Sequence, residues 1–170
     1  MVQGFSGLKD YLEISEEKDL GKLFFKMGMV FNESAPSSLG TIISFWLLGI
    51  GGSLKGKENA DKNDMKIALE NGISKLKERA NSKENEKTIL DSLSPATKVF
   101  EKNSAEDKAI VEILKETYEA ASKGSEATKN MMAVHGRAAY HGEKTMGHVD
   151  GGSYVGRLIF EGIYNYYKEK

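Results

Sequence analysis

The stretch LGTIISFWLLGIGGSL, residues 39–54, decides the fold class. It carries no charged residue, and its apolar side chains surround a helical projection on every side instead of forming one stripe. A helix that is hydrophobic all round is buried, either in a protein core or in a membrane. The apolar run from Thr41 to Ile50 is too short to cross a bilayer. We therefore expect this segment to be the central helix of a soluble helical bundle.

The segments on either side of this helix also have apolar residues at helical spacing. Asp19 is placed to cap a helix over residues 20–32, and Ser37 or Ser38 to cap the central helix. Only two prolines interrupt the chain. The pattern predicts an all-α fold, an antiparallel up-and-down helical barrel or bundle of about seven helices. The length predicts a single domain over residues 1–170.

Several element boundaries can be predicted in the second half of the chain. Ser104 and Asp107 resemble a capping box that opens a long amphipathic helix, which Gly124 would end. Residues 126–135 predict a short helix with two core methionines. A last helix over residues 152–167 would turn five apolar side chains inward, namely Val155, Leu158, Ile159, Ile163 and Tyr166.

Composition excludes several functional classes. The formal net charge is −1, from 24 basic and 25 acidic residues, so no global field favours nucleic acid or an anionic membrane as a partner. The absence of cysteine removes disulfide scaffolds, thiolate metal sites and cysteine nucleophiles. The N-terminus lacks a basic region followed by an apolar one. We expect a cytoplasmic protein with neither nucleic-acid nor membrane partners.

Three familiar kinds of site are poorly supported. The glycines and lysines of residues 51–57 lack the spacing of a Walker phosphate loop. The three histidines, His135, His141 and His148, form no compact ligand motif for zinc, and we predict no metal ligands. A serine nucleophile lacks the required strand-turn-helix context in an all-helical chain.

The stretch GRAAYHGEKTMGHVDGG, residues 136–152, is the richest in glycine and charge. Its end, Asp150, Gly151 and Gly152, stands at the start of a helix, as do Ser37 and Ser38. The N–H groups at a helix N-terminus bind anions, and a guanidinium such as that of Arg137 binds phosphate as a fork. These residues therefore predict a phosphate site, with Arg137 as the residue that acts in catalysis. The alternatives are a solvated loop and an Arg137 that caps the preceding helix.

The order of these motifs resembles the nucleotide-binding L subunit of dihydroxyacetone kinase. The family pattern reads Lys-Thr-Met-x-Asp, then Gly-Arg-Ala-x-Tyr-x-Gly-Glu-Arg-x-x-Gly-His-x-Asp-Pro-Gly. Residues 87–91 read KTILD, and residues 136–152 follow the second pattern. Residues 1–6 are similar to the family's Asn-Met-x-x-Gly-Phe-Ser, so the resemblance covers essentially the whole chain.

The resemblance implies an eight-helix antiparallel barrel that holds ADP or ATP with Mg²⁺ at one end. In the phosphotransferase-dependent systems, the bound ADP is rephosphorylated by a phosphoryl donor subunit and passes phosphate to dihydroxyacetone on a K-type subunit; related enzymes consume ATP. By resemblance, Arg137, Asp150, Gly151 and Gly152 lie near the phosphates, Thr88 and Ile89 approach the base, and Ser37 and Ser38 stand in the phosphate loop.

The departures from the family pattern concern the metal and the phosphate loop. The family's magnesium ligands come from Gly-Asp-x-Asp-x-Gly, upstream of the position that Met1 occupies here, so the chain is N-terminally incomplete relative to the family and lacks those ligands. The family's phosphate loop, Gly-Gly-Ala-Ser-Gly, is replaced in this chain by residues 33–38, ESAPSS. We therefore expect weak nucleotide binding and poor phosphoryl transfer from the chain as it stands.

Two functional hypotheses follow. The first is a nucleotide-binding phosphoryl-transfer subunit that acts on dihydroxyacetone or a related small hydroxyketone. The alternative is a non-catalytic helical regulator or partner module built on the same scaffold. In either case, a barrel that lacks its first helix would expose apolar surface, which self-association or a partner helix would cover.

Overall fold

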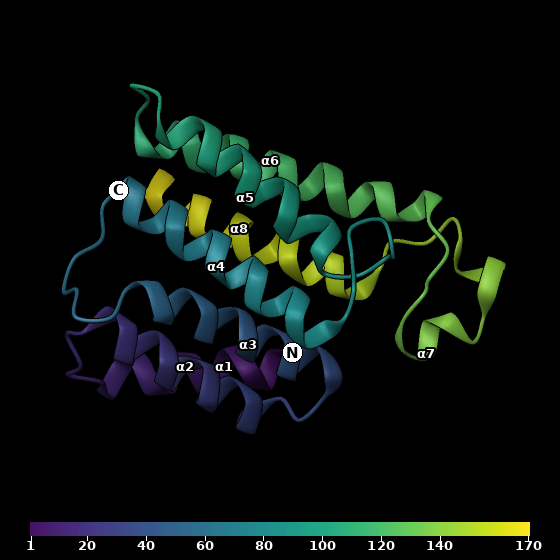
Figure 1. Cartoon of the computed structure of the whole chain (residues 1–170), viewed down its shortest axis with the longest axis horizontal. Helices are drawn as coiled ribbons and strands as arrows, with labels where there is room; N and C mark the ends of the chain where they lie inside the picture. Colours follow the sequence, from purple (N-terminus) through teal and green to yellow (C-terminus); the bar gives the residue numbers. More distant parts are fainter. The chain divides into compact units, whose positions relative to one another are not determined.

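The computed structural model describes all residues from 1 to 170, and it is all-α with no strand, as predicted (Figure 1). Seven α-helices are long, from 13 residues in α1 to 19 in α4, and α7 has four residues. The helices are α1 (Val2–Ile14), α2 (Leu20–Ser34), α3 (Ser38–Ser53), α4 (Lys62–Ala80), α5 (Leu90–Ser104), α6 (Ile110–Ala127), α7 (Gly136–Ala139) and α8 (Gly151–Lys168), with two 3₁₀ turns, η1 (Thr128–Asn130) and η2 (Gly142–Thr145). None of these helices is both long and apolar enough to cross a membrane.

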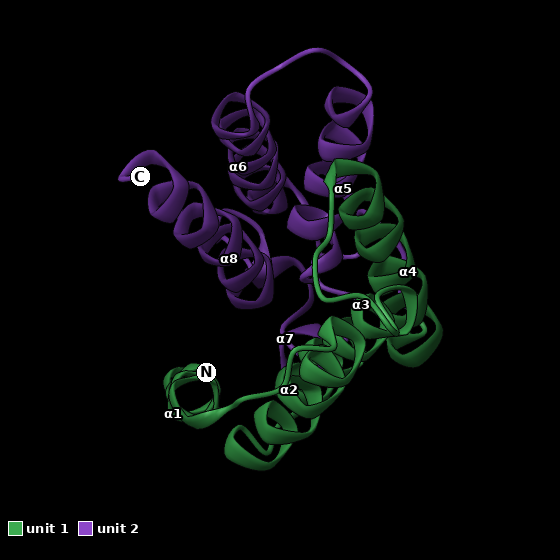
Figure 2. Cartoon of the chain, turned by 90° about the vertical axis from the view of Figure 1, so that its left-hand side faces the viewer, with its two compact units in different colours: residues 1–81 green, residues 82–170 purple.

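The contacts divide the chain into two compact units, residues 1–81 and residues 82–170 (Figure 2). In the first unit, each of the helices α1 to α4 packs against the next one in sequence. In the second unit, α5, α6 and α8 all contact one another.

In the first unit, α3 is the buried helix that the sequence predicts. Ile43, Trp46 and Ile50 are at most 4% exposed. Gly49 lets α3 approach α4 closely, because a Cβ built there would lie 2.7 Å from the carbonyl oxygen of Asn71. Two predicted caps are confirmed, since the side chain of Asp19 accepts the N–H of Lys22 and that of Ser37 accepts the N–H of Gly40.

In the second unit, three predicted boundaries are wrong. Ser104 is the last residue of α5 and donates its hydroxyl to the carbonyl of Glu101, so it does not open α6. Gly124 does not end α6, which continues to Ala127. Residues 131–135 are not helical, because the chain leaves α6 through η1, and Met132 is 49% exposed.

The inward face of the last helix was also predicted wrongly. Ser153, Gly156 and Phe160 are its buried residues. Leu158, Ile163 and Tyr166 are 45%, 38% and 56% exposed. Small side chains face α5 here, because a Cβ on Gly156 would lie only 2.1 Å from the hydroxyl of Ser92. The apolar stripe of α8 is therefore a surface without a partner in its own unit.

Candidate functional site

Among the long helices of the second unit, only α8 begins with a side-chain cap. Asp150 caps the helix, with its Oδ2 accepting the N–H of Ser153 at 2.7 Å. The N–H of Gly151 has no acceptor within the chain, and a Cβ built on Gly151 would meet no atom within 4 Å. A free backbone donor at a helix start, on a glycine whose side-chain position is open, suits the close approach of a phosphate group.

The carboxyl group of Asp150 is partly withdrawn from water. Burial raises its pKa above the usual value, and the N–H groups of Ser153 and Gly152 and the charge of Lys87 oppose that rise. The backbone N–H of Asp150 donates to the hydroxyl of Thr128 at 2.9 Å. The cap is thus held from both its side chain and its backbone.

Ile89 lies directly beside this helix start. A Cβ on Gly152 would lie 3.3 Å from the backbone nitrogen of Ile89 and 3.5 Å from its Cβ. Ile89 is 2% exposed, whereas Thr88 is partly exposed. The structure therefore brings two segments of the predicted site together, Ile89 and the start of α8.

The turn that precedes α5 is organised by Asp91. Its Oδ1 accepts the N–H of Asn85 at 2.5 Å and its Oδ2 accepts the N–H of Thr88 at 2.7 Å. Asn85 and Lys87 both adopt left-handed backbone conformations, with φ of 69° and 60°. Both oxygens of this buried carboxylate are therefore engaged within the chain.

Arg137 lies in α7, within the loop that joins α6 to α8 (Figure 1). Its side chain is exposed and makes no hydrogen bond or ion pair within the chain. The alternative that it caps a preceding helix does not hold, because the last turn before it, η1, ends at Asn130 and the Arg137 side chain donates to no carbonyl.

The loop around Arg137 has its own hydrogen bonds. Thr145 accepts the N–H of Ala133 at 3.1 Å, and the N–H of Gly147 donates to the carbonyl of Lys129 at 2.7 Å. Nε2 of His135 lies 2.6 Å from Oε2 of Glu86. This partner, together with the N–H of Lys83, lowers the pKa of Glu86. The loop is thus tied to the turn that precedes α5.

A family model described as the DAK2 domain matches residues 1–165. The chain belongs to this family. It is 26% identical over 163 residues to the PEP-dependent dihydroxyacetone kinase 1, ADP-binding subunit DhaL of Listeria innocua, covering 96% of this chain and 76% of that one. It is 29% identical over 150 residues to a probable dihydroxyacetone kinase of Dictyostelium discoideum, covering 81% of this chain but only 23% of the relative.

A solved structure shows the same fold. The dihydroxyacetone kinase of C. freundii in its native form superposes with a TM-score of 0.71 at 19% identity, over 96% of this chain and 28% of that chain. The DAK2 chain thus spans less than a third of the longer kinases that it matches.

Ser37 and Ser38 of the DAK2 chain lie in the first unit, whereas the other predicted site residues lie in the second. The hydroxyl of Ser37 accepts the N–H of Gly40 at 3.0 Å, so it caps α3. Ser38 is the first residue of α3 and is exposed.

The DAK2 chain contains no group of three histidine or acidic side chains placed to hold a metal ion. Asp91 and Asp150, the two carboxylates nearest the start of α8, already accept backbone N–H groups. The residues present therefore do not fit the magnesium that the family resemblance implies.

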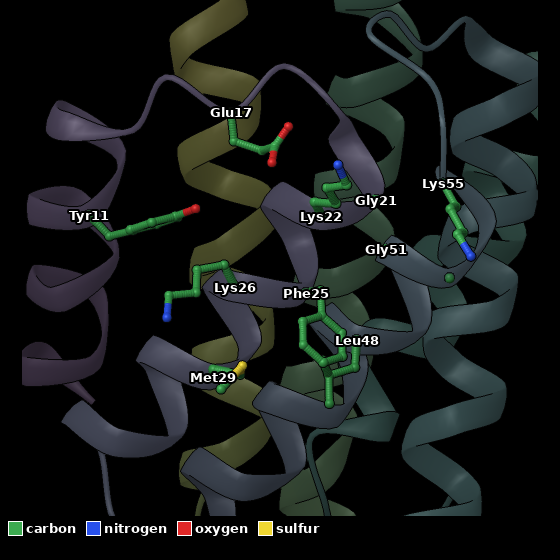
Figure 3. Close-up of a pocket in the computed structure, with 11 residues that line it drawn as sticks. Tyr11, Glu17, Gly21, Lys22, Phe25, Lys26, Met29, Leu48, Gly51 and Lys55 are labelled. Carbon is green, nitrogen blue, oxygen red and sulfur yellow. The ribbon is translucent and has the colours of Figure 1, made fainter.

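The first unit of the DAK2 chain contains a cavity of about 620 Å³ that shares no residue with the predicted site (Figure 3). Its lining combines the side chains of Phe25, Met29 and Leu48 with three lysines, Lys22, Lys26 and Lys55. Tyr11 extends from α1 toward α2 at its edge (Figure 3). The cavity is mostly apolar, with cations at its rim.

In the second unit, Lys87 is the residue near the start of α8 that the sequence analysis did not identify. Its ammonium donates to the carbonyls of Thr128 and His148, both at 2.6 Å. The only signal in the sequence is that Lys87 opens the KTILD stretch. Nothing in that spacing indicates that a lysine would be 6% exposed.

Proposed function

We propose that this chain is a nucleotide-binding phosphoryl-transfer subunit of the dihydroxyacetone kinase type, with ADP or ATP as its nucleotide. The observation that carries the proposal is the open, Asp150-capped start of α8 beside Ile89, in a chain of the DAK2 family. The Listeria relative, of which the chain covers 76%, is named as an ADP-binding subunit, which supports the choice of nucleotide.

The proposal gives each site residue a role. The N–H groups of Gly151 and Gly152 would face the phosphates, next to the Asp150 cap. The exposed and unpaired guanidinium of Arg137 would bind a phosphate with two parallel hydrogen bonds and act on the transferred group. A bound nucleotide would supply the phosphoryl group, and this chain's residues would bind and orient it.

Four further residues complete the proposed nucleotide site. Thr88 and Ile89 would contact the base from the turn before α5. Ser37 and Ser38, at the start of α3, would add hydroxyl and N–H donors in place of a glycine-rich phosphate loop.

The proposed acceptor is dihydroxyacetone, or a related small hydroxyketone, on a separate K-type subunit. The Listeria relative is named as a subunit of a kinase, which supports a separate subunit as the carrier of the acceptor. The Listeria relative is named as PEP-dependent, which supports a phosphotransferase-system subunit as the phosphoryl donor. We propose that the chain works in the cytoplasm with these partners.

The first test is calorimetric titration of the 170-residue chain with ADP and ATP, in magnesium and in chelator. We expect weak binding that changes little on chelation, because no carboxylate cluster couples the nucleotide to a metal. Tight binding that collapses on chelation would contradict that expectation. No binding of either nucleotide at millimolar concentration would refute the proposal and favour the regulator alternative.

The second test is Arg137→Lys, with Arg79→Lys as the matched control. A lysine keeps the charge but not the fork, and hydrogen bonds to charged groups contribute about 1.5–3 kcal/mol, so affinity should fall roughly tenfold to a hundredfold. The side chain of Arg137 has no intramolecular partner, so the melting temperature of Arg137→Lys should equal that of the wild type. Arg79, which lies over the ring of Phe45 in the first unit, should leave affinity unchanged when replaced. A lowered melting temperature with unchanged affinity in Arg137→Lys would remove Arg137 from the site.

A further inference from the structure

Lys87 occupies a position that is unfavourable for a lysine in two respects. It is 6% exposed, and its φ of 60° lies in the left-handed region that residues with a Cβ avoid. Asn85, two residues earlier, is also left-handed, and Asp91 holds the turn through the N–H groups of Asn85 and Thr88. Such strain persists only where the surrounding structure imposes it, and it concentrates at functional sites.

The ammonium of Lys87 joins the two ends of one loop. Its two acceptors, the carbonyls of Thr128 and His148, stand immediately before and after residues 129–147. Both contacts, at 2.6 Å, are short enough for charge-assisted hydrogen bonds. That loop carries Arg137, so a single side chain closes the loop at its base.

The same junction also fixes the start of α8. Thr128 is fully buried, and its hydroxyl accepts the backbone N–H of Asp150 at 2.9 Å. One turn further in, the hydroxyls of Ser125 and Ser153 lie 3.1 Å apart. The end of α6, the end of the loop and the cap of α8 therefore meet around the ammonium of Lys87.

A buried ammonium is costly to desolvate, and an apolar side chain could fill the same space without that cost. Burial lowers the pKa of Lys87, and the nearby charge of Asp150 partly offsets this. The structure thus keeps a positive charge at a place where packing does not require one. That charge lies behind the helix start at which a phosphate would bind.

We propose that Lys87 is a positioning residue. By holding the carbonyls of Thr128 and His148 together, it fixes the loop that carries Arg137 relative to the start of α8, in the arrangement that binds an anionic ligand. The loop-closing part of this inference stands on geometry alone. The ligand part rests on the function proposed above.

The test compares Lys87→Met with the wild type and with Lys123→Met, an exposed lysine of α6 without a partner. Hydrogen–deuterium exchange is followed in peptides from residues 129–150 and in peptides from α6 and from the first unit. ADP affinity is measured on the same samples by calorimetry. Methionine is unbranched and close to lysine in volume, but it lacks the ammonium and therefore both the charge and every donor.

In Lys87→Met, we expect exchange in residues 129–150 to rise tenfold or more, with little change elsewhere, and ADP affinity to fall about tenfold. Lys123→Met should match the wild type in both measurements. Unchanged exchange in residues 129–150 would overturn the loop closure. Faster exchange with unchanged affinity, in a wild type that binds ADP, would overturn the positioning role.

Two further outcomes are separable. If the wild type binds no nucleotide, the proposed function fails and the ligand part of this inference fails with it, while exchange still decides whether Lys87 closes the loop. If Lys87→Met does not fold, Lys87→Gly replaces it, because glycine adopts φ of 60° without strain and also lacks the ammonium. The same results are expected from that variant, and the same results would refute the inference.

Discussion

Replacing Gly124 by alanine should separate α5 from α6. A Cβ at this position would lie 2.0 Å from the carbonyl oxygen of Asp91 and 2.9 Å from Cγ of Pro95. Pro95 has no N–H to bond that carbonyl within α5, so the oxygen stays directed at the backbone of α6. Position 124 therefore requires glycine because the two helices approach closely there, and not because of its backbone conformation.

The magnitude follows from the size of the overlap. Ordinary contact begins near 3.4 Å, so the helices would have to move apart by about 1.4 Å, and the opposing atom belongs to backbone that cannot rotate away. Overpacking of this kind costs about 1–3 kcal/mol and occasionally more, while alanine regains about 1 kcal/mol of helix propensity. The difference is about 0–2 kcal/mol, and the upper end applies here because the overlap is with backbone. We therefore expect Gly124→Ala to lower the free energy of unfolding by about 2 kcal/mol, which is about 4–8 °C in Tm for a chain of this size.

Gly162→Ala is the matched control. Gly162 also lies inside a helix, α8, but a Cβ built there meets nothing within 4 Å. This variant should gain about 0.5–1 kcal/mol of stability. Both changes are read from thermal unfolding by circular dichroism. If Gly124→Ala proved as stable as Gly162→Ala, the close approach of α5 and α6 would be refuted.

Three further predictions concern the cap, the loop and the surface of α8. Asp150→Ala should cost about 1 kcal/mol of unfolding free energy through the lost cap, whereas Asp150→Asn, which keeps an acceptor, should melt close to the wild type at neutral pH; equal losses in both would contradict the capping role. The pKa of Glu86 is lowered in the folded state, so the stabilising contribution of Glu86 is present above the ordinary value of 4.5 and is lost as pH falls through the folded pKa. Glu86→Gln should therefore reduce the fall in Tm between pH 6 and 3.5. If the Tm of Glu86→Gln fell in parallel with that of the wild type, the pair with His135 would be excluded. The exposed apolar residues of α8 predict self-association, which Leu158→Lys should reduce in sedimentation velocity, and a wild type that stays monomeric at high concentration would show that this face needs no cover.

The parts of the fold that could be predicted from the sequence are those decided locally or by gross composition. The uncharged stretch that became α3 had to be buried, and Asp19 and Ser37 cap helices because their side chains reach N–H groups three residues on. The number of long helices follows from the same periodicity.

The errors in the second unit arise where tertiary contacts outweigh local signals. Ser104 has a capping residue's side chain, but it bonds back to Glu101 and ends a helix instead. Gly124 has the residue type of a helix end, but it serves a close approach between helices. On α8, Ser153 and Gly156 are buried beside Phe160 while Leu158, Ile163 and Tyr166 are exposed, because only a small residue fits at positions such as 156, where a Cβ would meet the hydroxyl of Ser92. None of these contacts is visible in a single sequence.

The candidate site divides in the same way. Helix-start chemistry indicated Asp150, Gly151 and Gly152, and the resemblance added Ile89, which the structure brings beside them. Lys87 could not be predicted, because a lysine in a polar turn is expected to be exposed, and its role depends on two carbonyls that lie 41 and 61 residues away. Arg137 differs again, since its guanidinium has no partner in the chain. Because no side-chain contact orients Arg137, its position depends on the backbone of its loop. In the proposal above, Lys87 fixes that backbone at the base of the loop, and this is how the buried lysine affects the exposed arginine.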